Sequence, residues 1–131
     1  MTTSPQDSRS ALSSPPRRKA LFVINSDPRT SPRTAEAIRI AAGVGTWRKI
    51  EVTVVLCETA VMALSEFPDD LVDEDHFRRY LPIIGEWGRP VFVETGAPLL
   101  NDLGQTPVPY ERITISQLAA MAADSDYVLR F

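Results

Sequence analysis

The sequence predicts an α/β protein in which a five-stranded, mainly parallel sheet lies between two layers of helices, a three-layer α/β/α sandwich. Short apolar runs alternate with helix-like segments, which is the pattern of a parallel sheet. The run Ala20-Leu21-Phe22-Val23-Ile24 is continuously apolar, as expected for a strand covered on both faces. The length of 131 residues fits one domain with a substantial core.

The strands are expected at five runs: Ala20–Ile24, Glu51–Cys57, Pro90–Glu94, Arg112–Ile115 and Tyr127–Phe131. Helices are expected over residues 34–47 and 58–64. A third helix begins at the acidic residues 73–75, and Pro82 should kink or end it near Leu81. Ser116 is expected to cap the last helix, whose inward side chains are Leu118, Met121 and Ala122.

The helix over residues 34–47 carries two apolar stripes. One stripe contains Ile38, Ala41, Ala42 and Gly45, and the other contains Ile40, Val44 and Trp47. One of them can lie on the sheet, whereas the other needs a partner helix or a second subunit. Together with the apolar Phe131, this second stripe predicts a homo-oligomer.

Composition limits the classes of function. Residues 1–19 are rich in Ser, Pro and Arg and are expected to form a flexible tail before a domain over residues 20–131. The net charge of -3 gives no overall basic field, so direct nucleic-acid binding is not expected. No apolar stretch approaches the roughly 20 residues of a membrane span, and no hydrophobic signal region is present, so a cytoplasmic protein without membrane contact is expected. A single cysteine excludes an intramolecular disulfide framework and a cysteine-based zinc cluster, and a single histidine argues against a histidine-rich metal site.

Cys57 is the first candidate for chemistry, because it stands where a strand meets the start of a helix. Partial positive charge at a helix N-terminus stabilises a thiolate, although the adjacent Glu58 opposes this effect. A buried cysteine at a strand end is instead an inert small hydrophobe. Both interpretations stay open at this point.

Ligands of open parallel sheets bind beyond the carboxyl ends of the strands. After the first strand, Ser26, Arg29 and Arg33 precede a helix start and suit an anion. The alternative is a proline-stiffened turn whose Ser31 or Thr34 caps the helix.

After the third strand, Glu94, Thr95 and Gly96 form a turn in which the carboxylate is either a base or a solvated rim residue. The chain has neither a Walker loop nor a GxGxxG pattern, so no cofactor is expected. The acids before His76 are interpreted as a helix start and not as metal ligands.

Three segments resemble the DsrE/DsrF-like family of small sulfur-relay proteins, which includes TusC-like and TusD-like subunits. They are Ala20–Pro28, Val52–Val61 and the ending Leu118–Phe131 with its Asp124-Ser125-Asp126-Tyr127-Val128-Leu129-Arg130-Phe131. The resemblance covers residues 19–131 and implies a five-stranded α/β/α sandwich, oligomers, and persulfide transfer on a cysteine after the third strand. In this chain, Glu94 occupies that cysteine's position, and a carboxylate does not carry a persulfide.

Two functions follow as hypotheses. The chain takes part in sulfur relay, either as a persulfide carrier through Cys57 or as a non-catalytic paralogue that binds a carrier, with a sulfur-donor or acceptor protein as partner. Its rival is an oligomeric module that binds a small ligand or anion through Arg29, Arg33 and the turn at Glu94, with no sulfurtransferase activity.

Overall fold

Five parallel strands form one sheet in the order β4-β3-β2-β1-β5, in a computed structural model that describes residues 17–131. The strands are β1 (Arg18–Ile24), β2 (Ile50–Leu56), β3 (Val91–Glu94), β4 (Tyr110–Ile113) and β5 (Tyr127–Arg130). Every neighbouring pair is parallel. The predicted five-stranded parallel sheet is therefore confirmed.

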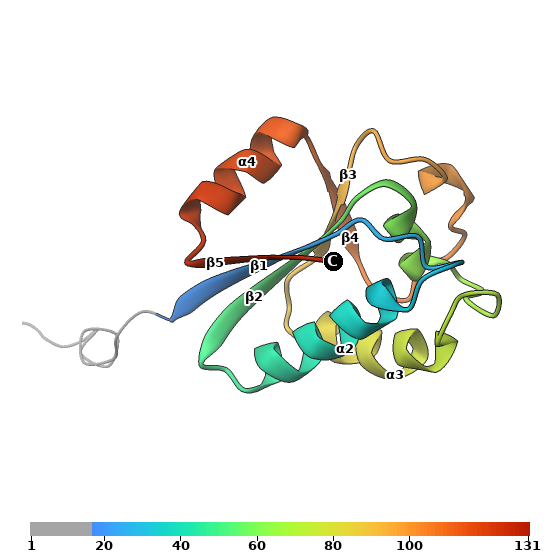
Figure 1. Cartoon of the computed structure of the whole chain (residues 1–131), viewed down its shortest axis with the longest axis horizontal. Coiled ribbons are helices and arrows are strands. Elements are labelled where there is room, and N and C mark those ends of the chain that lie inside the picture. The colour runs from blue at the N-terminus through green and yellow to red at the C-terminus, as the bar shows by residue number, and fades with distance from the viewer. Residues whose placement is uncertain (1–16) are drawn as a thin grey trace, which may run out of the picture.

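Helices cover both faces of this sheet (Figure 1). One face carries α2 (Arg33–Thr46) and α3 (Glu74–Gly85), and the core on this face also includes residues of the 3-10 helix η1 (Glu58–Leu64). The other face carries α4 (Ile115–Asp124), which lies apart from α2 and α3 in Figure 1. A short 3-10 turn, η2 (Leu100–Asp102), lies between β3 and β4. The three-layer arrangement agrees with the prediction.

The two faces of the sheet differ in how well they are covered. Phe22, Ile24 and Leu56 belong to the larger core beneath α2 and α3. Their neighbours along the same strands point the other way, because successive side chains of a strand alternate between faces. The smaller core contains Leu21, Val23, Val55, Cys57 and Ile113, against which Leu118, Met121 and Ala122 of α4 pack as predicted. All residues of α4 keep some solvent exposure, so this face has the thinner cover.

The second apolar stripe of α2 finds its partner within the chain. Helices α2 and α3 pack side by side, and Ile40 and Val44 are partly buried against the larger core. Only Trp47 of that stripe is widely exposed, at 64%. Phe131 stacks on Phe22 with ring centroids 5.6 Å apart. The stripe therefore needs no second subunit, which removes the observation on which the oligomer was predicted.

Exposed apolar side chains gather instead on β5, which is an edge strand of the sheet. Tyr127, Val128 and Leu129 are 48%, 39% and 37% exposed. We call these three residues the β5 edge. Exposed apolar residues on an edge strand form a surface for association.

The first strand begins earlier than predicted. Arg18 and Lys19 were expected in the tail, but they pair with Ile50 and Glu51 of β2. The Lys19 ammonium also lies 2.7 Å from an oxygen of Asp124, because β1 begins beside the end of α4. Residues 1–16 of the predicted tail lie outside the described residues.

Helix α3 passes through Pro82, although the sequence predicts an end or kink there. Proline lacks the amide hydrogen that would bond to the Arg78 carbonyl, but it can still accept a hydrogen bond. The Glu86 amide donates to the Pro82 carbonyl at 3.1 Å, so the helix continues for one more turn. The Pro82 ring is exposed, which keeps it clear of the core.

The last helix begins at Ile115 and not after Ser116. Thr114 is its N-cap, and the Thr114 Oγ1 accepts a hydrogen bond from the Gln117 amide at 3.1 Å. The Gln117 side chain accepts in return from the Thr114 amide at 2.8 Å, which completes a capping box. The strand before it is Tyr110–Ile113, so the β-branched Ile115 belongs to the helix and not to the strand.

The other strand and helix ends lie within one residue of the prediction. Residues 58–64 form a 3-10 helix, whereas a regular helix was expected. Within residues 17–131, no helix combines the length and the apolar character that crossing a membrane requires.

Candidate functional site

Cys57 and Glu94 lie side by side at the carboxyl edge of the sheet. The register pairs Leu56 of β2 with Val93 of β3, so the next residue along each strand, Cys57 or Glu94, faces the other. Neighbouring strands are about 4.8 Å apart. Side chains two residues apart in a strand point to the same face. Val55 and Phe92, which stand two residues before Cys57 and Glu94, belong to the smaller core, so Cys57 and Glu94 point to the face that carries α4. The structure thus brings together two predicted residues from different loops.

The surroundings of Cys57 favour its neutral thiol. The side chain is 7% exposed, and burial is the main cause that raises the pKa of Cys57 to about 11. The carboxylates of Glu94 and Glu58 raise this pKa further, whereas the Arg130 guanidinium lowers it. This is opposite to the thiolate enrichment expected from a helix N-terminus.

The backbone explains why the helix start does not activate the thiol. Cys57 is the N-cap of η1, a 3-10 helix of seven residues, and has extended backbone angles. Its amide donates to the Ile24 carbonyl at 2.8 Å, which holds the residue in line with the sheet. Glu58 has a φ of 53°, a left-handed value that is rare for a residue with a side chain. The chain thus turns sharply at Glu58, which places a carboxylate at the start of η1, close to the thiol.

The loop after β1, which was predicted to bind an anion, contains a carboxylate that pairs with Arg29. The Arg29 Nε and Nη2 donate to the carboxylate of Asp27 at 3.0 and 2.9 Å, and the Arg29 amide donates to the same group. These bonds hold the pKa of Asp27 below its usual value. Arg29 is therefore engaged within its own turn and not directed at a ligand, which argues against the predicted role of this residue.

The other predicted residues of this loop serve the fold. The Arg33 Nη2 donates to the Arg130 carbonyl at 3.3 Å, and its guanidinium lies 6.0 Å from the Phe131 ring centroid. Ser26 accepts, through its backbone carbonyl, a 2.8 Å hydrogen bond from the buried Thr34 hydroxyl. Thr34 thus fastens the loop and does not cap α2, whose N-cap is Pro32.

Thr95 and Gly96 form the turn that follows Glu94, and both are exposed. The Thr95 amide donates to the Ile113 carbonyl at 2.9 Å, so the turn is anchored to β4. The Ala97 amide donates to the Glu94 carbonyl at 3.0 Å and closes the turn. Glu94 itself is half-buried between this open turn and Cys57. Among residues 17–131, no group of three or more His, Cys, Asp and Glu side chains is arranged to hold a metal ion.

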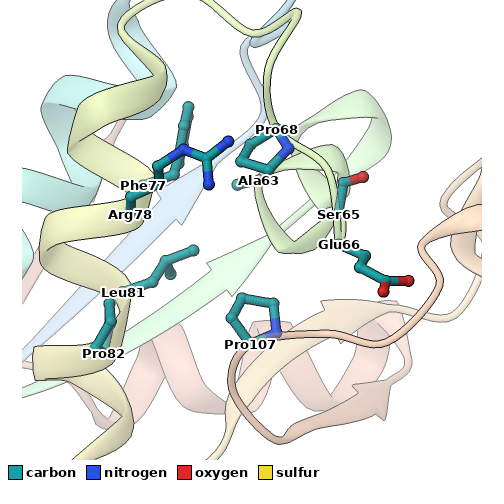
Figure 2. Close-up of a pocket in the computed structure, with 9 residues that line it drawn as sticks. All are labelled: Ala63, Ser65, Glu66, Pro68, Phe77, Arg78, Leu81, Pro82 and Pro107. Atoms are coloured by element: carbon teal, nitrogen blue, oxygen red, sulfur yellow. The ribbon is translucent and has the colours of Figure 1, made fainter.

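One small cavity is lined by none of the predicted site residues. Figure 2 shows that it lies between η1, α3 and the loop before β4. Its volume is about 100 Å³. Phe77, Leu81, Pro82 and Pro107 give it mainly apolar walls, and Arg78 lies at its side. The Arg78 guanidinium pairs with Asp69 and Glu74, so its charge is already balanced.

The sequence reasoning missed a second, larger concentration of polar side chains. Arg48 and Arg89 line a cavity at the opposite, amino edge of the sheet, beside Trp87. A signal was present in the sequence, because Trp47-Arg48-Lys49 precedes β2 and Trp87-Gly88-Arg89 precedes β3. The prediction considered only the loops at the carboxyl edge.

The five-stranded parallel sheet between two helical layers defines a protein with a three-layer α/β/α fold. Among solved structures, the chain is similar to the YchN protein from E. coli, with a TM-score of 0.71 and 20% identity. The likeness covers 87% of this chain and 99% of that chain, and at this identity it establishes the fold alone. No protein-family model matches the chain, and no curated protein matches it.

Proposed function

We propose that this chain is a cytoplasmic DsrE-like protein of sulfur relay that lacks the carrier thiol, and that it binds a sulfur carrier instead of carrying sulfur itself. The observation that supports this proposal is the pair formed by Cys57 and Glu94 at the carboxyl edge. By the resemblance to the family, Glu94 takes the position of the sulfur-carrying cysteine, and the neighbouring Cys57 thiol is held neutral.

Sulfur transfer requires a thiolate, which attacks the outer sulfur of the donor's persulfide while the donor leaves as a thiolate. With a pKa of about 11, the Cys57 thiol is ionised in roughly one molecule in ten thousand at pH 7. The side chain is also 7% exposed, which limits the approach of a partner's sulfur. Both properties argue against a carrier role for Cys57.

The test is intact mass after incubation with a low-molecular-weight persulfide at pH 7. Native wild type and Cys57→Ser should both gain no sulfur. The double variant Cys57→Ser/Glu94→Cys should gain sulfur, because position 94 is half-buried beside an open turn and is reachable. Titration of wild type with a thiol reagent in denaturant is the control that Cys57 is present and unmodified.

Two results would contradict the proposal. Gain of sulfur at Cys57 in the folded wild type would identify Cys57 as a carrier. Failure of the folded double variant to gain sulfur would mean that position 94 is not a sulfur-accepting position, and the relay interpretation would fail with it.

The same proposal includes association of identical chains through the β5 edge. Tyr127, Val128 and Leu129 supply apolar surface on an edge strand, where a second chain can cover it. Light scattering at micromolar concentration should give an oligomer for wild type and a smaller species for Tyr127→Lys. Trp47→Lys is the matched control, because Trp47 is exposed at 64% just after α2 and does not belong to β5. A monomeric wild type would refute this association.

A further inference from the structure

A cavity of about 360 Å³ opens at the amino edge of the sheet, opposite the edge that holds Cys57 and Glu94. It lies where β1 and β2 begin and where α2 and α3 end. Its lining includes three arginines, Arg17, Arg48 and Arg89, and one carboxylate, Glu86. Positive charge therefore predominates in this cavity, although the whole chain has a net charge of -3.

Arg89 is held in place from several sides. Its Nη2 donates to the Val52 carbonyl at 2.7 Å, and its guanidinium lies 5.7 Å from the ring centroid of Trp87. Glu51 lies 3.7 Å from the Arg89 Nη1, and its carboxylate balances part of this charge. A guanidinium has five donor hydrogens, so Arg89 keeps donors for a further acceptor. This fixed orientation lowers the entropy lost when a ligand binds.

Arg48 and Arg17 bring charge without a counterion. Among residues 17–131, no carboxylate oxygen lies within 4.0 Å of either guanidinium. Arg48 has a φ of 65°, the left-handed conformation that normally selects glycine or asparagine just after a helix. Arg48 therefore occupies a position where the backbone of a residue with a side chain is strained.

The remaining walls are apolar and closely fitted. The indole of Trp87 lies against Gly45 of α2, and a Cβ at Gly45 would overlap the ring. Ile50 and Ile83 also line the cavity. The cavity thus combines guanidinium groups with apolar surface, and its volume falls at the lower end of the range for small-molecule sites.

We infer that this cavity binds a small phosphate-bearing ligand, whose phosphate contacts Arg17, Arg48 and Arg89 and whose organic part lies against Trp87 and the isoleucines. Guanidinium groups recognise phosphate oxygens by paired hydrogen bonds, which explains why arginines and not lysines line the site. This inference goes beyond the proposed sulfur-relay function and does not depend on it, because it uses none of the residues at the carboxyl edge.

The experiment is calorimetric titration of the full chain with pyrophosphate and with inorganic phosphate, at constant ionic strength in chloride. Arg48→Gly is the key variant, because it removes one guanidinium and also relieves the left-handed backbone, so it should fold at least as well as wild type. Its Kd for pyrophosphate should rise about tenfold, the loss expected for one charge-assisted contact in a half-open site. Arg29→Ala is the matched control, since it removes the same charge at the opposite edge and should leave the Kd unchanged.

Three results would overturn the inference. The first is the absence of saturable pyrophosphate binding to wild type. The second is an equal rise in Kd for Arg48→Gly and Arg29→Ala, which would show a response to net charge and not a site. The third is a Kd for a short single-stranded RNA that is about 100-fold lower than the Kd for pyrophosphate and that rises in Arg48→Gly. This result would identify a nucleic-acid surface instead.

Discussion

Two glycines near the end of α2 should respond to the same substitution in opposite directions. A Cβ at Gly43 would meet no atom within 4 Å, because this position faces open space. A Cβ at Gly45 would overlap the indole of Trp87, whose ring lies at the end of α3. Replacement of each glycine by alanine therefore tests the packing of Trp87 on α2.

The expected magnitudes follow from these surroundings. Alanine is favoured over glycine inside a helix by about 0.5–1 kcal/mol, so Gly43→Ala should raise the free energy of unfolding by that amount. At Gly45 the same gain is opposed by displacement of the indole. If displacement exposes about 50–100 Å² of apolar surface, the cost is about 1–2.5 kcal/mol. Gly45→Ala should therefore lower the free energy of unfolding by about 1 kcal/mol.

Urea unfolding followed by circular dichroism measures both effects. A Trp47→Phe background leaves Trp87 as the one tryptophan, so its fluorescence maximum should shift to longer wavelength in Gly45→Ala and stay constant in Gly43→Ala. Equal stabilisation by both substitutions, with no change in fluorescence, would refute the packing of Trp87 on Gly45. It would also mean that Trp87 does not form a wall of the neighbouring cavity.

Three further predictions concern stability. Raising the pH from about 9 to about 11 should destabilise wild type relative to Cys57→Ala by about 2 kcal/mol, because the unfolded thiol ionises near 9.0 and the folded one near 11. Urea titrations at several pH values would contradict this if the stabilities of the two proteins changed in parallel. Thr114→Ala should lower the free energy of unfolding by about 1 kcal/mol through loss of the capping box, whereas Ser116→Ala should change the melting temperature little. Equal losses of stability in a thermal melt would mean that Thr114 is not the cap. Pro82→Ala should raise the free energy of unfolding by about 1–2 kcal/mol, since the Arg78 carbonyl gains the backbone amide of residue 82 as a donor. A lower melting temperature for this variant would argue against a continuous α3.

Much of the fold could be predicted from local patterns. The apolar run at residues 20–24 identified a buried strand, because a strand covered on both faces has no polar alternation. The β-branched run at residues 50–56 identified a second strand. Element ends were less certain where one residue suits two structures. Ile115 has strand character by composition, but the hydrogen bonds between Thr114 and Gln117 make it the first residue of a helix.

The sequence named candidate residues for a site, but it could not establish their surroundings. The sequence by itself determined that Cys57 and Glu94 stand at the ends of consecutive strands, since order along the chain and strand type are local properties. Only the tertiary structure decided that the pKa of Cys57 is raised, because burial and the charge of Glu94 depend on the packing of distant segments. It likewise decided that α3 covers the second stripe of α2, and that Arg17, Arg48 and Arg89 meet at one cavity. Such convergence is a property of three-dimensional packing, to which residues far apart in sequence contribute together.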